Sequence, residues 1–234
     1  MSKKQSHFAS RQFFYLLFIT ILLFQCVAGL NAQTPAPDHD RFSQEINAFI
    51  QWDRKNSFPE HAVLFVGSSS IRLWNTASSF PKLTVINRGF GGSEISDVNH
   101  YYDHVVKRYN PARIVFYAGD NDIAAGKSAN QVIGDFQLFI EKVEHDFPKT
   151  EVFYLPIKPS ISRWKLWPEM VIANGKIKAF IETKPNLFYV DTATPMLDES
   201  TRPRPELFMD DGLHLNERGY QLWNGILSSY LENN

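Results

Sequence analysis

The stretch VLFVGSSSIRLW, residues 63–74, joins four consecutive apolar residues to a turn of one glycine and three serines. Two of these apolar residues are β-branched and one is aromatic, which predicts a strand that is buried on both faces of a sheet. In open α/β sheets, ligands bind at the carboxyl ends of the strands because helices cover both faces. We therefore expect any chemistry of this chain at the polar turn that follows the strand.

Strand-like and helix-like patterns alternate along the rest of the chain. Further strands are expected at residues 83–86, 114–118, 152–157 and 187–190, and helices at residues 42–52, 95–109, 128–147, 169–183 and 216–231. Regular alternation of this kind produces a parallel sheet with helices on both faces. The predicted fold class is therefore α/β, as a three-layer α/β/α sandwich around five parallel strands.

The first 32 residues have the three-part layout of a secretory signal peptide. Basic residues come first, residues 13–24 form an almost unbroken apolar run, and small residues follow up to Ala32. The apolar run is short for a membrane span. Residues 33–40 are then predicted to be a flexible tether and residues 41–234 a single domain, in a protein that is periplasmic or secreted. The alternative is an interaction module that is tethered to the membrane by an uncleaved helix over residues 13–30.

Composition narrows the class of protein further. The chain has 234 residues, of which 44% are hydrophobic and 21% charged, so it is neither disordered nor fibrous. The formal net charge is −1, and this balance argues against nucleic acid as a partner. Cys26 is the only cysteine and lies in the predicted signal peptide. The mature domain is therefore expected to be stable through its core, without disulfides.

A late segment of the sequence places a carboxylate and an imidazole close together. His214 follows Asp211 by three residues, so one turn of chain can bring the two side chains side by side. A serine hydroxyl becomes a nucleophile when such a base takes its proton and a partner orients that base. Glycine N–H groups and an asparagine amide are donors suited to a developing oxyanion. Together these residue types favour acyl transfer on a serine.

Four short motifs stand in order along the chain: GSS at residues 67–69, NRGFGG at residues 87–92, GDND at residues 119–122 and DGLH at residues 211–214. They resemble the four motifs of the SGNH or GDSL-type serine hydrolases. The chain looks most like the platelet-activating-factor acetylhydrolase-like branch of that family. The resemblance implies five parallel strands in flavodoxin-like order, and ester hydrolysis that needs neither a metal nor an organic cofactor.

The resemblance also implies a role for individual residues. Ser69 would be the nucleophile, and His214 would be the base that Asp211 orients. The main-chain N–H groups of Ser69 and Gly92, together with the side chain of Asn121, would form the oxyanion hole.

One position departs from the family pattern. Ser68 stands where the family has an acidic residue, in a supporting position directly before the nucleophile. Ser68 and Ser70 are themselves alternative nucleophiles, and all three serines are also typical of a turn that satisfies its own backbone. The register of the motif favours Ser69. Asp210 competes with Asp211 in the same way, but only Asp211 has the family spacing.

Other patterns give weaker alternatives. His100 and His104 have the spacing of a metal-binding helix, but the pattern lacks a third ligand, and a solvated helix face is favoured. Residues 89–92 lack the third glycine of a dinucleotide-binding loop. Ile71 stands where the nucleophile elbow of α/β-hydrolases requires a glycine.

Four residues are candidate substrate contacts. Trp164 and Trp167 lie in the loop after the fourth predicted strand, where aromatic faces suit a sugar ring or an acyl chain and suit packing equally. Arg88, like Arg163, suits an anionic substrate group and suits a surface charge equally.

These patterns predict a serine esterase or acylhydrolase that forms an acyl-Ser69 intermediate. The expected substrate is a small-molecule or glycan ester that carries an acetyl or other short acyl group on a carbohydrate or lipid headgroup. A lysophospholipase or thioesterase for longer chains is one alternative, because one scaffold hosts many activities. A non-catalytic sugar- or phosphate-binding protein on a degenerate hydrolase scaffold is the other. No stable membrane insertion is expected once the signal peptide is cleaved.

Overall fold

The computed structural model describes residues 38–232, so the predicted signal peptide and residues 33–37 of the predicted tether lie outside the described residues. The sheet has five strands, β1 (Val63–Gly67), β2 (Val85–Gly89), β3 (Arg113–Tyr117), β4 (Glu151–Tyr154) and β5 (Leu187–Tyr189). All neighbouring strands are parallel, and their order is β2-β1-β3-β4-β5. This order confirms the predicted five-stranded parallel sheet and is the flavodoxin-like one.

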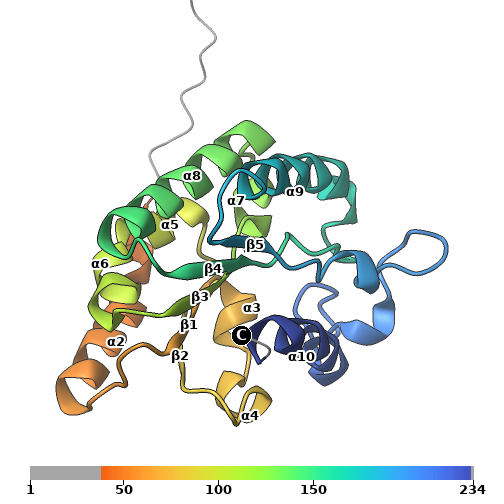
Figure 1. Cartoon of the computed structure of the whole chain (residues 1–234). Helices are drawn as coiled ribbons and strands as arrows, with labels where there is room; N and C mark the ends of the chain where they lie inside the picture. The colour runs from red at the N-terminus through yellow and green to blue at the C-terminus, as the bar shows by residue number, and fades with distance from the viewer. Residues whose placement is uncertain (1–37, 233–234) are drawn as a thin grey trace, which may run out of the picture. The chain divides into compact units, whose positions relative to one another are not determined.

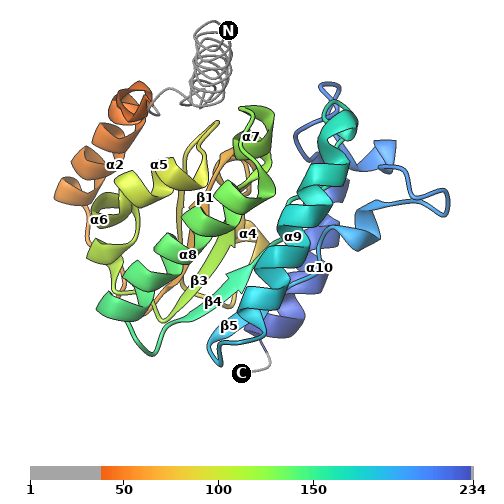
Figure 2. The ribbon, with the colours of Figure 1, turned by 90° about the horizontal axis from the view of Figure 1, so that it is seen from above.

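Helices cover both faces of this sheet, as Figures 1 and 2 show. One face carries α2 (Ser43–Lys55), α5 (Ile95–His100), α6 (Tyr102–Val105), α8 (Ala129–Asp146) and α9 (Trp167–Ile181). The other carries α3 (Ser69–Arg72), α4 (Thr76–Ser79) and α10 (Glu217–Leu231). The remaining elements are α7 (Asp120–Ala124) and the 3-10 helices η1 (His39–Phe42), η2 (Lys107–Tyr109), η3 (Trp164–Leu166), η4 (Thr194–Met196) and η5 (Pro205–Leu207).

Strand β1 shows how the sheet separates two apolar cores. Leu64 and Val66 pack in the core under α5 and α8, whereas Val63 and Phe65 pack in the core under α10. This alternation follows from the two-residue period of a strand. Every residue of β1 is buried, as the sequence predicts for a central strand between two helical layers.

Three elements differ clearly from the sequence prediction. Strand β4, expected over residues 152–157, is Glu151–Tyr154 and so ends three residues earlier. The helix expected over residues 95–109 is three short pieces, because the backbone leaves helical angles at Tyr101 and again at Val106. Strand β2 begins two residues later than expected and extends to Gly89, since it pairs with β1 up to Gly67. Residues 87 and 88, expected in the loop after this strand, are therefore strand residues.

The sheet order puts the ends of β1 and β3 next to each other. The chain leaves β1 toward β2 on one side and returns to β3 on the other, which is the switch point where α/β sheets bind ligands. Gly67 makes the close approach there, with φ of +138° and the position of an absent Cβ only 1.9 Å from the Tyr117 carbonyl oxygen. Any side chain at this position would collide with β3.

Candidate active site

Ser69, His214 and Asp211 form one continuous chain of hydrogen bonds. Nε2 of His214 lies 3.0 Å from Oγ of Ser69, and Nδ1 of His214 lies 2.5 Å from Oδ2 of Asp211. A hydrogen bond with the His214 ring, and two from main-chain N–H groups, lower the pKa of Asp211 to about 2. The Asp211 carboxylate is therefore an acceptor, so Nδ1 carries a proton, and Nε2 of a neutral ring accepts from the serine hydroxyl.

Ser69 is positioned by the turn between β1 and α3. It is the first residue of α3. The main-chain N–H group of the preceding residue, Ser68, donates to the Tyr117 carbonyl at 2.9 Å. The hydroxyl of Tyr220, in α10, donates to the Ser70 carbonyl at 3.0 Å. The turn is thus attached to the end of β3 on one side and to α10 on the other. The hydroxyl of Ser68 is fully buried and has no partner among the described residues.

The segment from residue 209 to residue 214 folds around the Asp211 carboxylate. Oδ1 of Asp211 accepts from the N–H groups of Leu213 at 2.8 Å and His214 at 2.9 Å. The N–H group of Met209 donates to the His214 carbonyl at 2.8 Å, which closes the loop. Gly212, at φ of +61°, supplies the left-handed residue of this tight turn. The three-residue spacing in the sequence therefore corresponds to a preformed acid–imidazole pair.

Ser93 joins the two loops that carry Gly92 and Asn121. The Ser93 carbonyl accepts from Nδ2 of Asn121 at 3.0 Å, and the buried Ser93 hydroxyl is 3.0 Å from the Phe90 carbonyl and 3.3 Å from that of Gly67. Gly92 is exposed at φ of +80°. Its N–H group and that of Ser69 donate to no other residue within the described part of the chain. Both groups are therefore unused donors at the strand ends.

The charged contacts that support Asn121 were not predicted from the sequence. Nη2 of Arg163 donates to Oδ1 of Asn121 at 2.9 Å, and Nη1 lies 3.1 Å from the Asp120 carboxylate. Buried Lys158 also contacts Asp120 at 3.3 Å and donates to the Tyr117 hydroxyl at 3.0 Å. Burial alone would raise the pKa of Asp120, but the two cations outweigh burial and lower it. Asp120 is thus a buried carboxylate between two cations.

The two tryptophans predicted to contact substrate lie against each other. The rings of Trp164 and Trp167 stack with centroids 6.0 Å apart, and the guanidinium of Arg202 lies 4.8 Å above the Trp164 ring. The same loop reaches the acid–imidazole turn, because the N–H group of Ser162 donates to the Gly212 carbonyl at 3.1 Å. Contact of either tryptophan with substrate stays a prediction.

The structure does not bring Arg88 to this group of residues. Its guanidinium donates to Asp53 at 2.7 Å and to the Tyr109 hydroxyl at 2.5 Å, and its side chain is 12% exposed. Because Arg88 lies within β2 and pairs with α2, its charge holds that helix against the sheet.

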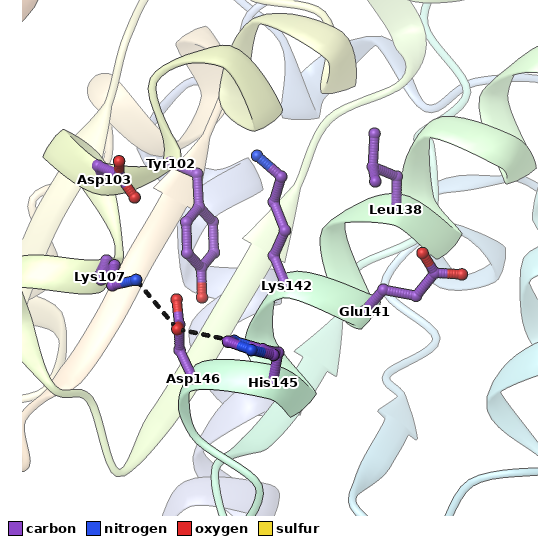
Figure 3. A pocket seen from close by; sticks show the side chains of 8 residues that line it. All are labelled: Tyr102, Asp103, Lys107, Leu138, Glu141, Lys142, His145 and Asp146. Carbon is purple, nitrogen blue, oxygen red and sulfur yellow. Dashed lines mark hydrogen bonds and ion pairs between the residues drawn. The ribbon is translucent and has the colours of Figure 1, made fainter.

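A separate pocket of about 340 Å³ lies beside α6 and α8, as Figure 3 shows. Its lining residues are Tyr102, Asp103, Lys107, Leu138, Glu141, Lys142, His145 and Asp146. Lys107 and His145 both lie 3.1 Å from Asp146, and Lys142 donates to a main-chain carbonyl at 2.8 Å. None of the predicted site residues lines this pocket, and its residues Lys107, Lys142, His145 and Asp146 already have partners. Nowhere in residues 38–232 do three or more His, Cys, Asp or Glu side chains gather as a metal site would require.

The sequence profile of the GDSL-like Lipase/Acylhydrolase family matches residues 72–222. The match covers more than half of the chain, so the protein belongs to this family and is a carboxylic ester hydrolase by class. The matched segment includes Asn121, Asp211 and His214 and begins three residues after Ser69. A comparison with curated proteins found no match.

Solved structures share the fold at low sequence identity. A protein from Streptococcus pneumoniae, assigned provisionally as a platelet activating factor, superposes with a TM-score of 0.73 and 23% identity, covering 80% of this chain and 92% of its own. A GDSL-like lipase from Bacteroides thetaiotaomicron has a TM-score of 0.68 and 20% identity, covering 83% and 97%. A carbohydrate esterase family 3 protein from Talaromyces cellulolyticus has a TM-score of 0.59 and 18% identity, covering 73% and 95%.

Proposed function

We propose that this protein hydrolyses carboxylic esters through a covalent acyl intermediate on Ser69. The observation that carries the proposal is the position of His214, whose ring contacts Ser69 through Nε2 and Asp211 through Nδ1. A serine flanked by an oriented imidazole is the arrangement that acyl transfer requires. Family membership favours this hydrolase over the non-catalytic binding protein.

The first half of the reaction follows from these contacts. Oγ of Ser69 attacks the ester carbonyl carbon while its proton passes to Nε2 of His214. The carbonyl π electrons move to oxygen, and the N–H groups of Ser69 and Gly92 with Nδ2 of Asn121 stabilise that oxyanion. When the intermediate collapses, the bond to the alcohol breaks and Nε2–H of His214 protonates the leaving oxygen.

The second half releases the acid. Water attacks the acyl-Ser69 carbonyl and gives its proton to Nε2 of His214, and the same base then returns that proton to Oγ of Ser69. Asp211 stays ionised throughout and stabilises the imidazolium that forms in each half. Every proton that moves is carried by His214, so one base serves both halves of the reaction.

We propose an acetyl or other short acyl ester on a carbohydrate or lipid headgroup as the substrate. The carbohydrate esterase from Talaromyces and an acetyl-xylooligosaccharide esterase from Geobacillus, at a TM-score of 0.61 and 12% identity, support this class through their fold. Exposed apolar side chains lie close to the catalytic loops: Leu73 is one turn after Ser69, and Ile161 lies against Gly212. Such side chains suit the alkyl part of a small ester.

A panel of p-nitrophenyl esters tests the acyl preference. We expect the full chain to show its highest kcat/KM on acetate or butyrate and much lower values on octanoate and dodecanoate. A preference for octanoate or longer chains would contradict the short-acyl proposal and favour a lysophospholipase or thioesterase. Release of acetate from acetylated xylooligosaccharides, compared with release of fatty acid from lysophosphatidylcholine, then separates the carbohydrate from the lipid headgroup.

We further propose that the protein is exported, on the layout of residues 1–32. The mature mass after expression in a Gram-negative host tests this, because cleavage near Ala32 shortens the chain. Recovery of the uncleaved mass in the membrane fraction would favour the tethered alternative. Among residues 38–232, no helix is long and apolar enough to span a bilayer.

A further inference from the structure

The guanidinium of Arg163 connects two side chains that follow β3. It donates through Nη2 to Oδ1 of Asn121 at 2.9 Å and lies within 3.1 Å of Asp120 through Nη1. The Arg163 side chain is 20% exposed, so it is largely shielded from solvent. Arg163 and Asn121 are 42 residues apart, and they come from the loop after β4 and from the first turn of α7.

The partners of Asn121 determine which way its amide points. Arginine has no acceptor, so the atom facing Arg163 must be the amide oxygen, and a carbonyl has no donor, so the atom facing Ser93 must be the amide nitrogen. Nδ2 of Asn121 has two hydrogens, and the Ser93 carbonyl takes one of them. The second hydrogen is the one available to an oxyanion.

Asp120 and Lys158 hold Arg163 in place. The Asp120 carboxylate is buried between Nη1 of Arg163 and Nζ of Lys158, and Lys158 is 1% exposed. Two cations and one carboxylate leave this cluster with an excess positive charge directly behind the Asn121 amide. An arginine that donates to the amide oxygen also polarises the amide, which strengthens its N–H groups as donors.

We propose that Arg163 is a positioning residue for the oxyanion hole, which fixes and polarises the Asn121 amide. This inference rests on the proposed function, because Asn121 must be an oxyanion donor for its orientation to affect turnover. Arg163 then acts in the transition state, where charge develops on the substrate oxygen, and contributes little to ground-state binding. Its removal should lower kcat and leave KM nearly unchanged.

The test is a double-mutant cycle on the full chain with p-nitrophenyl acetate. The variants are Arg163→Gln, Asn121→Ala and both together, with Arg163→Lys as the conservative change. Lys165→Gln is the matched control, because it removes one positive charge from an exposed position in the same loop. Thermal unfolding of each variant establishes that the protein is folded before its kinetics are compared.

We expect Arg163→Gln to lower kcat by about tenfold or more, short of the ~10²–10³ that loss of an oxyanion donor itself costs. In the Asn121→Ala background the same change should alter kcat by less than about twofold, because residues that act through one another are not additive. The kcat of Arg163→Lys should lie between that of the parent and that of Arg163→Gln, since lysine keeps the positive charge but cannot reach both partners. Lys165→Gln should match the parent.

Three results would overturn the inference. Equal loss of kcat in both backgrounds would show that Arg163 acts independently of Asn121. A rise in KM with kcat unchanged would instead make Arg163 a substrate-binding group, as would an effect confined to anionic esters. If Arg163→Gln fails to fold, Arg163→Lys with and without Asn121→Ala gives the same comparison. Failure of the proposed function is distinct, because Ser69→Ala would then retain the turnover of the parent.

Discussion

Nε2 of His214 lies 3.0 Å from Oγ of Ser69, although 145 positions separate the two residues in the chain. The turn after β1 supplies the serine, and the loop before α10 supplies the histidine. Tyr220, in α10, also bonds to the main chain at Ser70, so the helix that follows the histidine is fastened to the helix that carries the serine. The contact between Ser69 and His214 therefore depends on the packing of α10 against the sheet. We expect changes in that packing to alter turnover.

Asp211→Asn should lower kcat by a factor on the order of 10³–10⁴, because an amide no longer favours the protonated Nδ1 of His214 or stabilises the imidazolium. Steady-state kinetics on p-nitrophenyl acetate measure this. Asp210→Asn is the control, since this neighbour is also exposed and makes no contact with the His214 ring. Equal loss in both variants would contradict the assignment of Asp211.

The lowered pKa of Asp211 determines how its contribution to stability changes with pH. Its folded value of about 2 lies below an unfolded value of about 3.9, so its contribution to stability is present above about pH 4 and is lost as the pH falls through about 2. Activity lost between pH 7 and about pH 4 should therefore not come from Asp211. The residual activity of Asp211→Asn should therefore show the same decrease between pH 7 and about pH 4. If that decrease is absent from the variant, Asp211 titrates between these pH values.

Ser93→Ala should destabilise the protein by about 1–3 kcal/mol, because its hydroxyl donates to buried carbonyl groups of Phe90 and Gly67. The same change should lower kcat, since the loop that carries Gly92 loses one of its two hydrogen bonds to the Gly67 carbonyl at the end of β1. Urea unfolding and ester kinetics measure the two effects, with exposed Ser57→Ala as the control. If the variant is destabilised but its kcat is unchanged, the loop that carries Gly92 does not contribute to turnover.

Asp122 should give stability a pH dependence of opposite sign to that of Asp211. Burial raises its pKa to about 7, although Lys127 lies 3.0 Å away. Between about pH 4 and about pH 7 the folded protein then holds a proton that the unfolded chain has lost, so this contribution is complete below about pH 4 and is lost as the pH rises to about 7.

Asp122→Asn removes this titration. The difference in the free energy of unfolding between the parent and this variant should therefore decrease as the pH rises from about 4 to about 7. Urea titrations at several pH values measure that difference. A constant difference, or one that increases with pH, would show that the Asp122 carboxyl is ionised over this range.

The elements that were predicted correctly share a local signal. Strand β1 is four apolar residues before a glycine, and α8 follows its N-cap Ser128, whose side chain accepts from the N–H group of Gln131. The contact between Asp211 and His214 is also local, because three residues separate them and one turn of chain brings them together. The sequence could therefore predict the order of the elements and the contact within the acid–imidazole pair.

The contacts that were missed are long-range. Nothing in the sequence distinguishes Arg163 from Arg88. Both were predicted to bind an anionic substrate group or to be surface charges. Their partners, Asn121 and Asp53, are 42 and 35 positions away, and only the packing of α2 and of the loop after β4 selects them. The start of β2 was missed for the same reason, since its pairing with β1 and not its own composition determines where it begins and ends.

Labelling with a serine-reactive probe shows directly whether Ser69 is the nucleophile. The parent, Ser69→Ala and Ser68→Ala are each treated with an organophosphonate serine probe, and p-nitrophenyl acetate turnover is measured before and after. Ser68→Ala is the matched control, because it removes the adjacent hydroxyl, which is buried and has no partner among the described residues. We predict that the parent and Ser68→Ala turn over substrate and bind the probe, whereas folded Ser69→Ala does neither. Labelling or full turnover in Ser69→Ala would contradict the account.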